Sequence, residues 1–336
     1  MQKFIILFLS FFSFLSISDA QVDSLKFGLK SEIIRALAAS PHYASTYYAG
    51  LKGEKFGSGL IFVSQDMGRS WTPLNNGNPI GEYVADIQAI AVARDENKTI
   101  YAGTWKDGLY KSSDEGKRWS RVLNFPSSDI RSIKTGIQNT NLVYAATYNF
   151  GVVKSVDGGK TWIRNLPEVI ENSFKFAWSI EIDEENDNII YAQAYNQGIW
   201  KSTDQGTTWN QILDVEGQIA WDLKVDNNGQ DLYVAASMRG DTISTIYHSN
   251  NAGENWTKLK NVPQIGASQI NVMQGENFKL LLLGSWRGGV HIHVQEKWVK
   301  LEEIAFDTIS EILLEGNDVV IGTWGDGVYR YNFLLK

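Results

Sequence analysis

One short motif recurs along the chain and constrains its fold more than any other feature. Four copies read Ser-x-Asp-x-Gly-x-x-Trp, and a fifth has Asn in place of Asp. Their tryptophans are 43 to 48 residues apart, and a shortened sixth copy at 294–298 follows after a further 42. Repeats of this length are typical of propellers and solenoids.

Each copy lies within a larger unit that predicts four β-strands. In the clearest unit, apolar strand formers alternate at 86–92 (strand a), 99–104 (b), 108–112 (c) and 119–123 (d), with turn residues between them. Strand b can be found seven times, at 47–50, 101–104, 144–147, 191–194, 233–236, 281–284 and 320–323. The sequence therefore predicts an all-β, seven-bladed β-propeller of four-stranded antiparallel blades.

The last unit lacks a complete strand d. Only 333–335 follow its third strand, whereas 24–29 precede the first unit and belong to none. A ring closed by pairing the two chain ends leaves no free inner edge. We therefore expect the N-terminal segment to supply the outer strand of the last blade.

The first twenty residues differ from all that follow. Lys3 is followed by an apolar run at 4–17 and then by Ser18-Asp19-Ala20, as in a secretory signal peptide. The run is shorter than the roughly 20 residues of a membrane-spanning helix, although an uncleaved anchor stays open as an alternative. We expect a signal peptide at 1–20, one propeller domain at 21–336, an exported protein in the periplasm or outside the cell, and no stable membrane insertion after cleavage.

Composition excludes several classes of function. A net charge of −7 gives no basic field for a nucleic acid, and the absence of cysteine excludes disulfides, thiolate metal sites and a cysteine nucleophile. His291 and His293 could face one side of a strand, but no third ligand is identifiable nearby. We expect no metal and no cofactor.

The repeated motif suits a tight turn between strands c and d. Its carboxylate can accept hydrogen bonds from turn amides, and its glycine can adopt positive φ. Asn251 keeps the accepting oxygen without the charge, which argues for a structural role at this position. We expect the same role for Asp66, Asp114, Asp157 and Asp204, and we expect packing between blades for Trp71, Trp119, Trp162, Trp209 and Trp256.

These copies resemble the Asp-box, or BNR, repeats of sialidases, xyloglucan hydrolases, sortilin-type receptors and a photosystem assembly factor. The resemblance covers essentially all of 21–336 and implies that the boxes lie away from the binding centre. The Arg-Ile-Pro signature of sialidases is absent. Residues 322–329 are similar to a xyloglucan-hydrolase segment, yet those enzymes place two propellers around a cleft and this chain predicts one.

The b–c and d–a connections of all blades converge on the axis, so we expect a binding face at that end. Five of the six residues that follow strand b in blades two to seven are aromatic: Trp105, Tyr148, Tyr195, Trp286 and Trp324, with Met238 as the sixth. Residues expected near the axis on strand a are Arg35, Gln88, Arg131, Trp178, Trp221, Asp222, Asn271, Ser310 and Glu311. Polar neighbours include Asp107, Arg287 and Asp326. The alternative is that the aromatic rings only wedge between blades.

Aromatic faces with polar neighbours favour a carbohydrate or peptide platform. The leading hypothesis is a non-catalytic binding or assembly propeller that recognises a glycan or protein partner. The alternative is a single-propeller glycoside hydrolase, which would need two opposed carboxylates. The candidates for that pair are Asp107, Asp222, Glu311 and Asp326.

Overall fold

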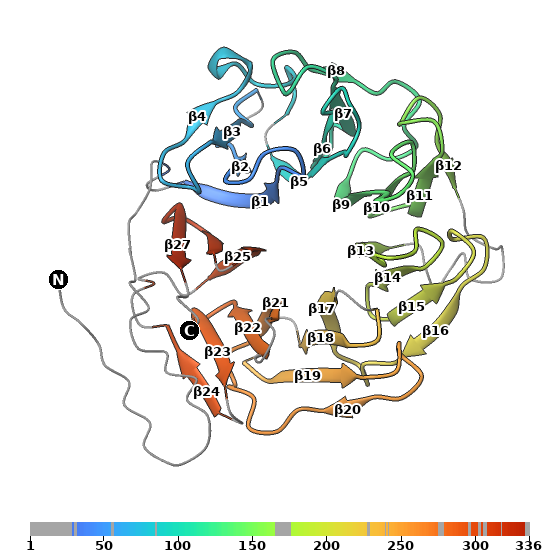
Figure 1. Ribbon diagram of the computed structural model, residues 1–336, viewed down its shortest axis with the longest axis vertical. Helices are drawn as coiled ribbons and strands as arrows, with labels where there is room; N and C mark the ends of the chain where they lie inside the picture. The colour runs from blue at the N-terminus through green and yellow to red at the C-terminus, as the bar shows by residue number, and fades with distance from the viewer. Residues whose placement is uncertain are drawn as a thin grey trace.

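The computed structural model describes residue 29 and most of 32–332, with gaps at 55–56, 85, 165–175, 227–228, 239, 241, 275–278, 295–296, 302–303, 305–307 and 317. Its strands form seven antiparallel sheets arranged as blades around a central axis (Figure 1). The prediction of a seven-bladed all-β propeller is confirmed. The one helical element in this part of the chain is a short 3₁₀ turn, η1 (Asn75–Gly77).

Within each blade the strands lie in sequence order from the axis outward. The innermost strands a are β1 (Ile33–Ala39), β5 (Ile87–Val92), β9 (Ile130–Thr135), β13 (Ala177–Ile182), β17 (Ile219–Val225), β21 (Ala267–Gln274) and β25 (Ile309–Glu315). Strands b are β2 (Tyr47–Lys52), β6 (Ile100–Thr104), β10 (Val143–Thr147), β14 (Ile190–Ala194), β18 (Leu232–Ser237), β22 (Lys279–Ser285) and β26 (Asp318–Thr323). Strands c are β3 (Ile61–Ser64), β7 (Leu109–Ser112), β11 (Gly151–Ser155), β15 (Gly198–Ser202), β19 (Ser244–Ser249), β23 (Val290–Val294) and β27 (Val328–Asn332). Strands d are β4 (Thr72–Pro73), β8 (Ser120–Arg121), β12 (Ile163–Arg164), β16 (Asn210–Leu213), β20 (Thr257–Lys258) and β24 (Lys297–Lys300).

The seventh blade has three strands in the described part of the chain. The N-terminal segment expected to complete it lies outside the described residues, apart from Leu29. The Leu29 side chain is buried in a cluster that joins the first blade, through Ile34 and Leu37, to Val320 and Val328 of the last. The first and last blades also meet through a bridge between Ile33 and Trp324. The ring is thus closed by direct packing of blade seven on blade one.

The c–d turns use the recurring side chains of the repeated motif in the same way. At Asp157, one carboxylate oxygen accepts hydrogen bonds from the Ser155 hydroxyl (2.8 Å) and the Thr161 amide (2.9 Å), and the other accepts one from the Thr161 hydroxyl (2.6 Å). Each motif tryptophan donates its indole N–H to the carbonyl of its own motif glycine, as Trp162 does to Gly159 at 3.2 Å. Asn251 accepts the equivalent bonds from Ser249 and Asn255 through its amide oxygen. The turn therefore needs an acceptor oxygen, which either Asp or Asn supplies.

The same turns also tie neighbouring blades together. Tyr101 and Lys111, on strands b and c of blade two, both donate to the carbonyl of Gly158 in the next c–d turn, at 2.8 and 2.7 Å. Tyr144 and Lys154 donate in the same way to Gln205 in the following blade. Burial lowers the pKa of Lys111 and of Lys154. These lysines are therefore structural links between blades.

No helix in the described part of the chain is long and apolar enough to cross a lipid bilayer.

Candidate binding site

Every innermost strand begins with a one-residue bulge. The strand pairing skips one residue near the start of β1, β5, β9, β13, β17, β21 and β25. The skipped residues are Arg35, Gln88, Arg131, Trp178, Trp221, Ser268 and Ser310. A bulge redirects a side chain that regular pleating would turn away, and all seven of these residues line one cavity on the propeller axis.

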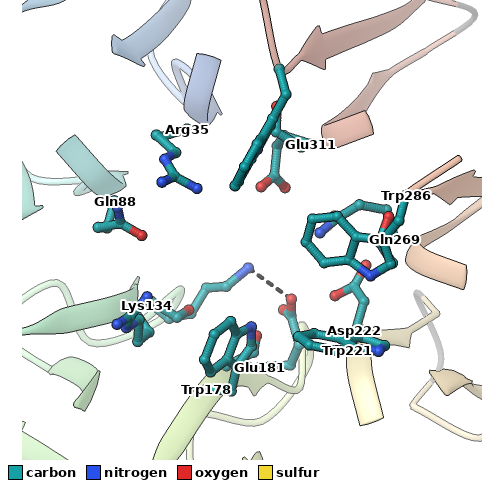
Figure 2. A pocket seen from close by; sticks show the side chains of 16 residues that line it. Arg35, Gln88, Lys134, Trp178, Glu181, Trp221, Asp222, Gln269, Trp286 and Glu311 are labelled. Atoms are coloured by element: carbon teal, nitrogen blue, oxygen red, sulfur yellow. Dashed lines mark hydrogen bonds and ion pairs between the residues drawn. The ribbon is translucent and has the colours of Figure 1, made fainter. Parts of the chain in front are cut away.

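Figure 2 shows the side chains that line this axial cavity. Its volume is about 170 Å³. Besides the bulge residues, its lining comprises Ser132, Lys134, Ser179, Glu181, Asp222, Gln269, Glu311, Trp286 and Trp324. Trp286 and Trp324 directly follow β22 and β26, so the cavity opens at the b–c end of the ring. Its size suits one side chain or one sugar ring rather than a whole polymer.

The structure corrects one residue on strand a. Asn271 does not line the axial cavity: its side-chain amide is buried and donates to the Ile312 carbonyl at 2.9 Å. Ser268 and Gln269 hold that place in blade six, because β21 begins at Ala267 and carries its bulge at Ser268. The other residues expected near the axis on strand a all line the cavity.

Four tryptophans form a continuous arc in the cavity wall. Trp178 and Trp221 pack edge to face with ring centroids 5.7 Å apart, Trp221 and Trp286 at 5.3 Å, and Trp286 and Trp324 at 6.0 Å. We call these four residues the tryptophan arc. The arginine guanidinium groups at its two ends lie over the terminal rings, Arg35 over Trp324 (4.3 Å) and Arg131 over Trp178 (4.9 Å).

The remaining aromatic residues of the predicted face lie outside the cavity lining. Trp105 and Tyr148 are 38% and 41% exposed, and the Tyr195 ring lies 6.0 Å from that of Trp178. Arg287 is exposed and does not line the cavity. Trp221 is the most buried tryptophan of the arc: it is only 8% exposed and donates its indole N–H to Ser237 at 2.7 Å.

Two of the four candidate carboxylates accept hydrogen bonds from a tyrosine of their own blade. Asp107 is buried and accepts a hydrogen bond from the Tyr110 hydroxyl at 2.6 Å, and Asp326 accepts one from Tyr329. Both follow a threonine at the end of strand b whose hydroxyl accepts the Asp backbone N–H, at 3.1 Å in each turn. These aspartates brace b–c turns and do not line the axial cavity.

Each cation that lines the axial cavity has a carboxylate partner. Arg35 pairs with Asp86 at 3.3 Å and Arg131 with Asp129 at 2.8 Å. Lys134 pairs with Glu181 at 2.9 Å across the boundary between blades three and four, the contact that the dashed line in Figure 2 marks. Burial alone would lower the pKa of Lys134, but Glu181, Glu311 and Asp222 together raise it. The positive charges of the cavity wall are therefore already balanced.

The other two candidate carboxyls, Asp222 and Glu311, line the axial cavity and have no ion-pair partner among the described residues. Within the described part of the chain, Asp222 accepts hydrogen bonds only from the backbone amides of Leu223 (2.9 Å) and Ile270 (2.8 Å). Burial raises the pKa of Asp222 to about 7. Burial and the nearby charge of Asp222 raise the pKa of Glu311 to about 8. Lys134 and Lys224 act in the opposite direction on both groups but do not offset the burial.

Sequence reasoning missed six lining residues: Lys134, Glu181, Gln269, Ser132, Ser179 and Ser268. Lys134 and Glu181 lie three residues after the bulges of β9 and β13, where β1 and β5 have Ala38 and Ala91. An alignment of the seven strands a on their bulges would have exposed these polar substitutions. In the described part of the chain, no three His, Cys, Asp or Glu side chains are grouped to hold a metal ion.

No family model matches the chain, and no curated protein sequence matches it. Solved structures share its fold. An ancestral GH74 enzyme superposes with a TM-score of 0.72 at 19% identity, over 92% of this chain and 46% of that one. YCF48 from Cyanidioschyzon merolae superposes with a TM-score of 0.66 at 14% identity, over 90% of this chain and 96% of that one. The extracellular domain of a hybrid two-component system from B. thetaiotaomicron superposes with a TM-score of 0.68 at 15% identity, over 92% of this chain and 39% of that one.

These neighbours include both a glycoside hydrolase and propellers of other kinds. The chain spans about half the length of the GH74 enzyme that it resembles. A further structure of YCF48 holds a bound D1 peptide. At these identities the similarity establishes the propeller fold.

Proposed function

We propose that this protein is an exported, non-catalytic binding or assembly propeller that recognises a glycan or protein partner at the mouth of the axial cavity. The observation that carries the proposal is the tryptophan arc, which gives one wall of the cavity a large aromatic surface. Aromatic surface next to a few convergent polar groups is the usual composition of a binding site.

The cavity and its rim suggest how a ligand would be held. About 170 Å³ accommodates one inserted group, while Trp105 and Tyr148 offer further exposed aromatic surface outside the lining. A ligand longer than the cavity would therefore insert one group and lie across the rim. The proposed Asp-box character of the c–d turns fits this arrangement, because their carboxylates are already occupied by turn hydrogen bonds.

The neighbours support both kinds of partner. YCF48, of nearly the same length, has been solved with a D1 peptide, and the GH74 neighbours are enzymes. Our proposal rests on the single propeller and on its cavity rather than on either neighbour's activity.

Glycoside hydrolysis is the second candidate, and one observation favours it. Asp222 and Glu311 are two carboxyls in one aromatic-lined cavity, with raised pKa values of about 7 and about 8. A carboxyl held protonated near neutral pH can act as a general acid, and a second can act as base or nucleophile. This reading predicts that bound polysaccharide is cleaved.

The test is binding of the mature protein to a glycan array and to a random peptide library. We expect ligands whose binding weakens by about 1–3 kcal/mol in Trp286→Ala and Trp324→Ala, the range of a modest hot spot. Ile163→Ala, on the outermost strand β12, is the matched control and should bind as wild type does. Equal binding by all variants would overturn the proposal, and release of reducing ends that stops in Glu311→Gln would establish the hydrolase instead.

A further inference from the structure

The ion pairs of the axial cavity leave two of its carboxyl groups without a partner among the described residues. Every lining cation is matched by its own carboxylate: Arg35 by Asp86, Arg131 by Asp129 and Lys134 by Glu181. Asp222 and Glu311 line the same cavity with no cation in contact among the described residues. The cavity therefore offers two carboxyl groups that form no ion pair with a described residue, while Lys134 and Lys224 act on both only through space.

We propose that the axial cavity binds a primary ammonium group of a protein partner, a lysine side chain or a chain terminus, with Asp222 and Glu311 as its counter-charges and the tryptophan arc as its wall. This inference rests on the proposed function, because it names the group that enters the cavity at the mouth of the ring.

The tryptophan arc favours an organic cation over a metal ion. Indole faces attract ammonium groups through their quadrupole, and Arg35 and Arg131 already lie over the terminal rings in this way. A metal ion would need oxygen or nitrogen ligands in place of that aromatic wall, and no three His, Cys, Asp or Glu side chains are grouped to hold one in the described residues. A carboxylate or phosphate ligand would meet arginines that are already paired.

Hydrogen bonding favours a primary ammonium over a quaternary one. Glu311 has no hydrogen-bond partner among the described residues, so both of its oxygens can accept N–H groups from a ligand. Asp222 accepts one backbone N–H on each oxygen and keeps further acceptor capacity. A primary ammonium has three donors to satisfy these acceptors, whereas a quaternary ammonium has none.

Proton release follows from this arrangement. The charged and polar groups facing the two carboxyls from the innermost strands are Arg35 on β1, Gln88 on β5, Arg131 and Lys134 on β9, Glu181 on β13, Lys224 on β17 and Gln269 on β21. In their presence the pKa of Asp222 is about 7 and that of Glu311 about 8, so the free cavity holds protons near neutral pH. A bound cation lowers both pKa values and expels these protons. Affinity should therefore rise with pH by about tenfold per unit for each proton released, until the carboxyls are ionised in the free protein.

The experiment measures the tryptophan fluorescence of the mature protein while Nα-acetyl-lysine amide, glycinamide or choline is added. Their neutral counterparts are Nα-acetyl-norleucine amide for the lysine analogue and 3,3-dimethylbutanol for choline. Titrations are run at pH 6.0 and pH 8.5 for the lysine analogue and choline, and at pH 6.0 and pH 7.0 for glycinamide, so that its α-amine stays largely protonated. We expect the lysine analogue or glycinamide to bind at least tenfold tighter than the neutral compounds, and to bind tighter at the higher pH.

Two variants and one control test the counter-charges. Glu311→Gln and Asp222→Asn should each weaken ammonium binding at least tenfold and remove part of the pH dependence. The control is Glu254→Gln, which removes an exposed carboxylate in a c–d turn and should leave the ammonium affinity and its pH dependence unchanged. Calorimetry of the wild-type protein in two buffers of different ionisation enthalpy should detect protons released on binding, which keeps the test valid if a variant folds poorly.

Several outcomes would overturn the inference. Equal binding of neutral and charged probes, binding that is tighter at pH 6.0, or unchanged binding by Glu311→Gln would each do so. Binding of choline alone would contradict the primary ammonium. If library ligands without an ammonium group bind in a Trp286-dependent way, the proposed function stands and this inference fails; if neither probe nor library ligand depends on Trp286, both fail.

Discussion

Gly322 in the last blade packs against Ile34 in the first, and a Cβ atom built on Gly322 would lie 2.8 Å from Cγ2 of Ile34. A glycine on strand b packs against an isoleucine on the next strand a at three other junctions of the ring: Gly50 with Ile87, Gly103 with Ile130 and Gly284 with Ile309. Where strand b carries a larger residue at this position, the next strand a carries alanine, as in Ala146 with Ala177 and Ala235 with Ala267. Each junction thus keeps a similar packed volume, and the pair of Gly322 and Ile34 shows that the closing junction is built like the others.

The closing junction should show strong coupling between its two residues. Gly322→Ala should lower the free energy of unfolding by about 1–3 kcal/mol through overpacking, and Ile34→Ala by about 2–5 kcal/mol through a cavity. The double variant should lose clearly less than the sum, since its Ala–Ala pair already occurs elsewhere in the ring. Urea denaturation of the four proteins measures this. As a matched control in another junction, Ala267→Ile should be rescued by Ala235→Gly; strict additivity at both places would contradict size matching.

The carboxylate of the c–d turn should matter for stability and not for binding. Asp157→Ala leaves the Lys160 and Thr161 amides and two hydroxyls without their acceptor, so we expect a loss of about 1–3 kcal/mol. Asp157→Asn should lose less, because Asn251 performs the same task in blade five. Thermal melts and binding titrations of the three proteins check this, and an Asp157→Ala protein that melts normally but has lost binding would refute the structural role.

A low pH should weaken these turns. The Arg118 amide and side chain lower the pKa of Asp114 to about 2, below the value of an unfolded aspartate. A depressed pKa contributes stability above the unfolded value of about 3.9 that is lost as pH falls toward the folded value. We expect the melting temperature of wild type to drop between about pH 4 and pH 2, and the difference between wild type and Asp114→Asn to shrink over the same interval.

A comparison of Trp324 with Trp162 tests whether the tryptophan arc is a binding surface or only packs between blades. Trp162 packs edge to face on Phe125 with ring centroids 4.8 Å apart and bonds to Gly159, so Trp162→Ala should cost about 3–5 kcal/mol. Trp324 is partly exposed in the axial cavity, and Trp324→Ala should cost clearly less stability. Melting curves of the two variants compare them directly, and equal large losses would mean that the tryptophan arc serves packing alone.

Glu311 should destabilise the folded protein as pH rises. Its pKa is about 8 in the folded state and about 4.3 in an unfolded chain. A raised folded pKa contributes stability that is complete below about pH 4 and is lost as pH rises through about 8. Relative to wild type, Glu311→Gln should therefore gain about 1–3 kcal/mol between pH 5 and pH 8.5, less than the full shift implies because the carboxyl faces a solvent-accessible cavity. Denaturation curves measure this difference in unfolding free energy at both pH values. A difference that is the same at pH 5 and pH 8.5 would contradict a buried, protonated Glu311.

Local signals in the sequence were sufficient to predict the fold. The motif period, the four alternating strands and the turn chemistry around Gly159 and Trp162 depend on residues close together in the chain, and these gave the number of blades and the strand order correctly. They also placed Arg35, Arg131, Trp178 and Trp221 near the axis, since every unit begins strand a in the same way.

The composition of the axial cavity depended on the tertiary structure. A one-residue bulge reverses which side chains face the axis, so Ser268 and Gln269 line the cavity where Asn271 was expected. Asp107 and Asp326 read as rim carboxylates in the sequence, yet the fold of each b–c turn places a tyrosine hydroxyl on them. The contact of Lys134 with Glu181, and the lack of an ion pair to Asp222 and Glu311 among the described residues, arise from how the blades are arranged. Only the packing of the blades around the axis brings such residues together, because each blade's sequence specifies its own strands and turns but not the side chains that it meets on other blades.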